Sequence, residues 1–140
     1  MKKKYEILTE FAKDISYEVP DVETYLQTKD NISKYHLNLD INSKFLKNKM
    51  IEVNIISKFQ EVNLEKKRSN FEITYSAIVK FNESITNDKE MEKIVLSDVP
   101  NEIYPRLEDL LITLINKCGF PDVKIERKVD FEKLYKEKFE

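Results

Sequence analysis

The chain has 140 residues, which is long enough for one domain with a substantial core. Its 24 Lys and Arg nearly cancel its 26 Asp and Glu, so the molecule as a whole is not a polycation and we expect no binding to nucleic acid. A single glycine, Gly119, leaves few residues suited to phosphate-cradling loops, which argues against a nucleotide-binding fold.

Cys118 is the only cysteine, which excludes an intramolecular disulfide framework and a zinc site built on cysteines. We therefore expect a reducing compartment, with the cytoplasm as the default. The basic start MKKKYEILTEF is similar to the beginning of a signal peptide, but Glu6, Glu10 and Lys13 interrupt the apolar run that such a peptide needs. No apolar run of about 18 residues occurs, so we expect no membrane-spanning segment.

The first predicted strand is FAKDISYEVP, Phe11 to Pro20. Read with a period of two, its apolar residues fall on one side and its carboxylates on the other. The apolar side is expected to pack inward on the helices and consists of Phe11, Ile15, Tyr17 and Val19. The outward side consists of Ala12, Asp14, Ser16 and Glu18. A longer excursion, residues 21–33, follows with room for a turn of helix.

Three further segments read as strands. Residues 35–45 and 71–81 alternate apolar and polar residues in the manner of half-buried strands. Residues 48–65 repeat the pattern less cleanly, because Ile56, Val62 and Leu64 have the parity opposite to the main apolar row. That strand is therefore buried on both faces at points, or it carries a bulge that switches parity. Short polar connections favour antiparallel neighbours.

After Asn82 the apolar period becomes helical, weakly over residues 87–96 and strongly over residues 100–119. Asn101 is the expected N-cap of this long helix and Gly119 its stop.

A second helix is expected over residues 131–140, with Asp130 as N-cap and one face formed by Phe131, Leu134, Tyr135 and Phe139. The order predicts a single α+β domain over residues 1–140. Its four-stranded antiparallel sheet would carry the long helix and the C-terminal helix on one face.

The residues do not form the pattern of an active site. His36, the only histidine, lies on the outward side of a predicted strand, and Cys118 reads as a packing residue at a helix end. The carboxylates lack metal-ligand spacing, so we predict no enzyme activity, no metal and no cofactor. The basic run EKKRS, Glu65 to Ser69, is typical of a solvated loop.

The aromatic residues, 7 Tyr and 8 Phe, are more informative. Two amphipathic helices must cover four strands, so part of the aromatic surface could stay open to solvent. Periodicity taken alone favours the alternative, in which all of these rings belong to the core.

Several short stretches together resemble the SecB family of export chaperones. KDISYEVP, Lys13 to Pro20, is similar to the family's first-strand signature, and YHLNLD, Tyr35 to Asp40, to its second strand. The resemblance runs in the right order from Tyr5 to Phe139. It also includes Pro100-Asn101 with Tyr104-Pro105-Arg106, Gly119-Phe120-Pro121, and Val129-Asp130-Phe131 with Leu134-Tyr135.

This resemblance implies an ATP-independent holdase that assembles as a dimer of dimers and keeps unfolded preproteins soluble. Clients would lie in an apolar groove between the sheet and the last helix, because hydrophobic burial makes little demand on sequence. Carried over by position, the client-binding residues are Tyr35, Leu37, Leu39, Leu134, Tyr135 and Phe139.

The resemblance further implies delivery to the SecA motor ATPase. Asp14 and Glu18 match acidic sheet positions that SecB-like proteins use to dock SecA, and Glu72 of the fourth predicted strand is the third expected docking residue. Thr74 stands where the family has a further outward acid, so the acidic surface is rearranged. A simply solvated strand face is the other interpretation.

Two alternatives stay open at this point. SecB-like relatives chaperone an antitoxin of a toxin–antitoxin system, and a client range restricted to an antitoxin would suit the same fold. A small-ligand-binding α+β domain would instead require convergent polar groups in a closed pocket.

Overall fold

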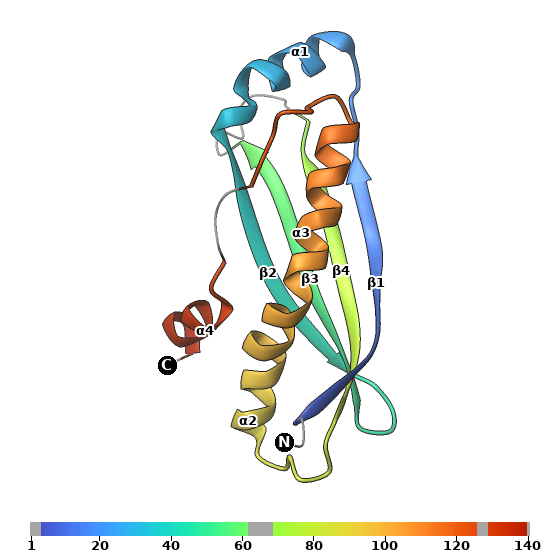
Figure 1. The fold of residues 1–140 in the computed structure, drawn as a ribbon, viewed down its shortest axis with the longest axis vertical. Helices are drawn as coiled ribbons and strands as arrows, with labels where there is room; N and C mark the ends of the chain where they lie inside the picture. Colours follow the sequence, from blue (N-terminus) through green and yellow to red (C-terminus); the bar gives the residue numbers. More distant parts are fainter. Residues whose placement is uncertain (1–3, 62–68, 126–128, 140) are drawn as a thin grey trace.

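A computed structural model describes residues 4–61, 69–125 and 129–139 of the protein. Within these ranges four strands form one antiparallel sheet in the order β1-β4-β3-β2, so β1 and β2 are its edges (Figure 1). The strands are β1 (Tyr5–Tyr17), β2 (Tyr35–Phe45), β3 (Met50–Glu61) and β4 (Phe71–Phe81).

Helices cover one face of the sheet, which confirms the predicted α+β class. Three consecutive helical segments form a long rod over this face, α1 lies across one end of the sheet, and α4 stands beside β2 (Figure 1). The excursion after β1 thus holds a full helix. The helical elements are α1 (Val22–Asn31), the 3-10 turn η1 (Ile32–Lys34), α2 (Asp88–Lys93), the π-helical turn η2 (Ile94–Asp98), α3 (Val99–Lys117) and α4 (Phe131–Phe139).

The long helical rod begins earlier than predicted. Asn87, not Asn101, is the N-cap, because its side chain accepts hydrogen bonds from the amides of Lys89 and Glu90. The rod passes through position 101 without a break, and the π-helical turn η2 precedes Pro100, which has no amide to donate to the regular helical ladder.

The predicted stop at Gly119 is confirmed. Gly119 has φ of +107°, a conformation that residues with a Cβ rarely adopt. A Cβ there would also lie 2.7 Å from Cε1 of Tyr25, whose hydroxyl donates to the Gly119 carbonyl at 2.8 Å. The glycine therefore ends α3 and lets α1 close over that end.

The core lies between α3 and the two central strands. The predicted apolar row of β4 is fully buried at four positions, namely Phe71, Ile73, Ala77 and Val79. The stripe of α3 that meets it consists of Val99, Ile103, Leu107, Leu111 and Ile115, each no more than 1% exposed. The apolar row predicted for β4 and the apolar stripe predicted for α3 therefore pack against each other in one interface.

Two β-bulges in β1 correct the predicted strand faces. The register with β4 shifts between Ile7 and Thr9 and again between Ala12 and Asp14. Each shift moves the following side chains to the other face of the sheet. Phe11 pairs with Ser76 on the face away from the helices, hereafter the open face, so its predicted inward orientation is wrong.

The same inversion turns Glu10 and Ala12 toward the helices. Glu10 accepts two hydrogen bonds from Arg106 of α3, from Nε at 2.5 Å and from Nη2 at 2.8 Å, and a third from the Tyr75 hydroxyl at 3.1 Å. Ala12, which was expected to face outward, pairs with Tyr75. The bulges thus turn Phe11 away from the helices and turn the Glu10 carboxylate toward Arg106 of α3.

The other residues of the first predicted strand lie partly within β1 and partly beyond its end. Tyr17 stacks on Phe71 with ring centroids 4.2 Å apart, as an inward residue should. Ile15 faces the helices yet is 47% exposed, because β1 is an edge. Val19 and Glu18 lie beyond the end of β1, and both are exposed.

The third strand is buried on both faces at points, as one of the two interpretations predicted. Its register with β2 and with β4 runs without a shift, and Asn54 is only 6% exposed on the open face. Val62, Leu64 and most of the run Glu65 to Ser69 lie outside the described residues.

We expect Ile103→Ala to lower the free energy of unfolding by about 2–5 kcal/mol, because it leaves a cavity between α3 and the sheet. Thr113→Ala, on the exposed side of the same helix, should change it by less than about 0.5 kcal/mol. Urea unfolding of both variants measures the difference, and equal losses would contradict this packing.

Candidate functional site

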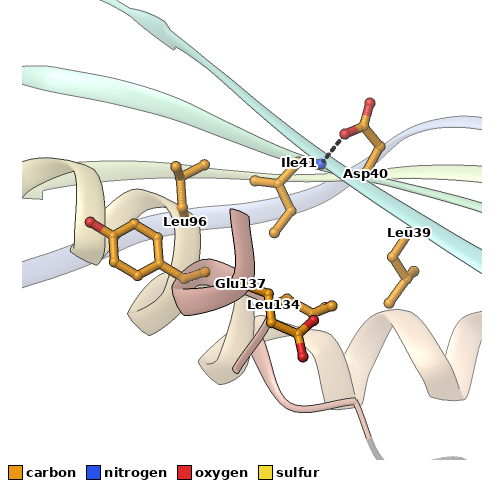
Figure 2. Close-up of a pocket in the computed structure, with 7 residues that line it drawn as sticks. Leu39, Asp40, Ile41, Leu96, Leu134 and Glu137 are labelled. Atoms are coloured by element: carbon orange, nitrogen blue, oxygen red, sulfur yellow. Dashed lines mark hydrogen bonds between the residues drawn. The ribbon is translucent and has the colours of Figure 1, made fainter. Parts of the chain in front are cut away.

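An apolar pocket of about 340 Å³ lies between β2, the π-helical turn η2 and α4. Figure 2 shows Leu39 and Ile41 reaching into it from β2 and Leu96 from the helical rod. We call it the β2–α4 pocket, and its lining residues are Leu39, Asp40, Ile41, Leu96, Leu134, Tyr135 and Glu137.

Two aromatic residues anchor α4 at the side of this pocket. Phe131 is 1% exposed and meets the ring of Tyr104 with centroids 5.4 Å apart. Tyr135 is 4% exposed, and its hydroxyl donates to Glu92 Oε1 at 3.3 Å. Leu134 remains 43% exposed at the pocket, and Leu39 and Ile41 of β2 are only half-buried, so α4 covers β2 only in part.

Capping fixes where α4 begins. The Asp130 carboxylate accepts a hydrogen bond from the Lys133 amide at 3.1 Å, which agrees with the predicted N-cap. Because the cap sets the first turn, Phe131 and Tyr135 fall one turn apart on the inner face, and Leu134 falls beside them.

A second pocket, of about 450 Å³, lies further along β2 beside η1, and we call it the β2–η1 pocket. Tyr35 forms part of its wall; this ring is 6% exposed, lies 5.3 Å from Phe59 by centroids, and its hydroxyl donates to the Ser69 carbonyl. The lining residues are Ile32, Ser33, Tyr35, His36, Leu37, Phe59, Asp122, Val123, Lys124 and Ile125.

The two pockets share one row of side chains. Leu37 lines the β2–η1 pocket and Leu39 the β2–α4 pocket, and both are half-buried on the helix-facing side of β2. Successive residues on one side of a strand are roughly 7 Å apart. The edge strand β2 therefore carries a nearly continuous row of apolar side chains, which α4 and the segment before it cover only in part.

The structure brings together five of the six predicted client-binding residues, although in two groups. Leu39, Leu134 and Tyr135 line one pocket, whereas Tyr35 and Leu37 line the other. Phe139 lies in the last turn of α4, and its side chain is outside the described part of the structure. The client-binding role of all six stays a prediction.

Sequence reasoning missed Ile41, Leu96 and Asp40 as pocket residues. Ile41 was available from the alternation of β2, since it follows Leu37 and Leu39 in the same row. Leu96 has no comparable signal, because the π-helical turn that aims it at β2 is not visible in the sequence pattern.

The open face carries the predicted docking acids. Asp14 pairs with Thr74, and Glu72 pairs with Ser16 of β1 and Lys58 of β3, so both acids lie on that face in neighbouring strands. Glu18 is exposed beyond the end of β1. Their docking role remains a prediction.

Basic residues lie among the acids on this face, since Lys58 of β3 pairs with Glu72 of β4. Lys13, at the second bulge, binds Glu52 Oε2 through Nζ at 2.9 Å. Hydrogen bonds from Asn54 and from Lys13 hold the pKa of Glu52 below its usual value, so this carboxylate is ionised at neutral pH. The open face is therefore a mixed-charge surface rather than an acidic one.

The described residues show neither an activated thiol nor a metal centre. Burial raises the pKa of the Cys118 thiol, which keeps it protonated at neutral pH. Across residues 4–61, 69–125 and 129–139, no group of three or more His, Cys, Asp or Glu is placed to hold a metal ion. In the same ranges no helix is long and apolar enough to cross a membrane.

Residues 1–140 match the family model described as SecB, preprotein translocase subunit SecB. The chain therefore belongs to the SecB family, whose members are protein-export chaperones and not enzymes.

Individual relatives agree with this assignment. The chain is 50% identical over 138 residues to a Pelagibacter ubique protein provisionally named protein-export protein SecB, with 99% of each chain covered. It is 22% identical to the protein-export protein SecB of Bradyrhizobium diazoefficiens, over 96% of this chain and 81% of that one.

A solved structure has the same fold. A SecB-like chaperone of Mycobacterium tuberculosis, solved in complex with a ChAD peptide from an antitoxin, superposes with a TM-score of 0.64 at 10% identity. The superposition covers 89% of this chain and 91% of that one. At this identity the likeness concerns the fold alone.

Proposed function

We propose that this SecB-family chaperone is an ATP-independent holdase that binds stretched segments of unfolded preproteins along β2. The observation that carries the proposal is the apolar row of β2, which α4 covers only in part. Leu134 of α4 is 43% exposed and lines the same pocket as Leu39. Burying one leucine of a client there would contribute about 1.5–3 kcal/mol, with little demand on sequence.

In this proposal the six predicted residues have different tasks. Tyr35 and Tyr135 are buried and form the walls of the two pockets, whereas Leu37, Leu39 and Leu134 offer the surface that a client contacts. Phe139 is included on the resemblance to the SecB family alone.

The proposal predicts that Leu37→Ser with Leu134→Ser weakens binding of an unfolded client by roughly tenfold or more, since two apolar contacts are lost. Leu26→Ser is the matched control, because Leu26 is 52% exposed on α1, outside both pockets. Dissociation constants for a fluorescent unfolded client, together with suppression of its aggregation, provide the measurement.

If the double variant bound the client as tightly as Leu26→Ser, this site would be wrong. A protein that failed to suppress aggregation but bound a metabolite tightly would instead favour the small-ligand-binding alternative. A pull-down dominated by one small partner would favour an antitoxin-dedicated chaperone over a general export role.

We further propose that the chain hands its clients to SecA through the open face. The support is the placement of Asp14 and Glu72 on neighbouring strands of that face, with Glu18 just beyond β1. Charges at such a rim govern the rate of encounter and its salt dependence.

Asp14→Lys with Glu72→Lys should therefore abolish SecA binding in a titration at low salt while aggregation suppression stays intact. Asp109→Lys, on the exposed side of α3, makes a comparable charge change away from the sheet and should bind SecA normally. SecA binding that survives the double reversal would exclude this docking face.

We also propose that the chain acts in the cytoplasm as a dimer of dimers, in which many weak client sites add avidity. The edge strand β1 supports self-association, because it presents the exposed Ile15 and a row of backbone groups that no other described strand pairs with. Light scattering should give the mass of four chains. A mass of one chain at micromolar concentration would refute the assembly.

A further inference from the structure

The β2–α4 pocket lies against a sheet edge. β2 pairs with β3 from Tyr35 to Phe45 without a register shift, and among residues 4–61, 69–125 and 129–139 no strand pairs with its other side. In an antiparallel pair, every second residue of an edge strand directs its N–H and C=O groups away from its partner strand. Such an edge can accept the backbone of an added extended chain.

One of these outward amides is already occupied. The Ile41 amide donates to Oδ1 of Asp40 at 3.0 Å, and both residues line the pocket. Figure 2 shows the Asp40 carboxylate on the other side of the strand from Leu39 and Ile41, with one oxygen turned back to the Ile41 nitrogen. The Asp40 carboxylate, which lies on the open face, thus occupies the edge amide of Ile41 beside the pocket.

This arrangement has no evident role in packing. Asp40 is exposed, and its cross-strand partner on β3 is Ile56 rather than a basic residue. A hydrogen bond between sequence neighbours at an exposed position is easily exchanged for another acceptor. A carbonyl of an extended client could therefore replace the carboxylate at the Ile41 amide.

We propose that Asp40 is a displaceable cap that controls access of client backbone to the edge of β2. In the empty protein the cap satisfies the Ile41 amide and opposes strand addition by other copies of the chain. A client that fills the β2–α4 pocket with an apolar side chain gains enough to displace it, and its backbone then pairs with β2. This inference rests on the proposed holdase function.

Removal of the Asp40 side chain should strengthen peptide binding, whereas removal of an ordinary contact residue weakens it. Asp40→Ala frees the Ile41 amide and should tighten binding of an uncharged peptide of alternating leucine and serine roughly three- to tenfold. Asp40→Asn is the matched control, since its amide oxygen still accepts from Ile41 while the charge is gone. It should bind the peptide within about threefold of the wild type.

Calorimetric titration of the three proteins with this peptide provides the test, and hydrogen exchange of the Ile41 amide in the free proteins provides an independent readout. We expect faster exchange in Asp40→Ala than in the wild type or Asp40→Asn. Equal tightening in Asp40→Ala and Asp40→Asn would assign the effect to charge and overturn the cap.

Unchanged or weaker binding by Asp40→Ala, with a wild type that binds, would overturn the cap and leave the holdase proposal standing. Failure of all three proteins to bind would overturn both proposals. The two failures are therefore distinguishable.

Discussion

Burial of one apolar stripe of α3 against the two central strands is the constraint on which the rest of the structure depends. Ile103, Leu107, Leu111 and Ile115 are no more than 1% exposed, and they meet β4 residues that are equally buried. Each such side chain contributes about 1.5–3 kcal/mol. Because the apolar face of α3 is buried against β3 and β4, other segments must cover the apolar residues of the two edge strands.

The edges solve this problem in different ways. β1 uses two bulges, which place Glu10 where Arg106 and Tyr75 can bind it and send Phe11 to the open face. β2 keeps a regular register, and its apolar row receives only the partial cover of α4 and of the segment before it. A chaperone needs apolar surface that is accessible yet supported by a rigid core, and β2 has both properties.

Much of this arrangement could be predicted because the hydrophobic periods are strong. The row of β4, the stripe of α3 and the stop at Gly119 follow directly from residue spacing. The faces of β1 could not be predicted, because a bulge has no signature in the alternation of Phe11, Ile15 and Tyr17. Asn101 failed as an N-cap because Asn87 begins a rod that is already helical there.

The site was predicted less completely than the fold. The resemblance to SecB pointed to Leu37, Leu39 and Leu134, and the structure brings them to two linked pockets. It gave no indication of Leu96, which depends on a π-helical turn, or of Asp40, whose position at an edge amide depends on strand order. Contacts that arise from the path of the backbone are not visible in residue spacing alone.

The most direct test of the central claim is contact mapping between the protein and a bound client. Intermolecular NOEs would be recorded from labelled Ile, Leu and Val methyl groups to an unlabelled unfolded client. We expect them from Leu37, Leu39, Ile41 and Leu134. NOEs confined to exposed methyl groups elsewhere, such as Leu8 of β1 or Leu26 of α1, would contradict the assignment of client binding to β2 and α4.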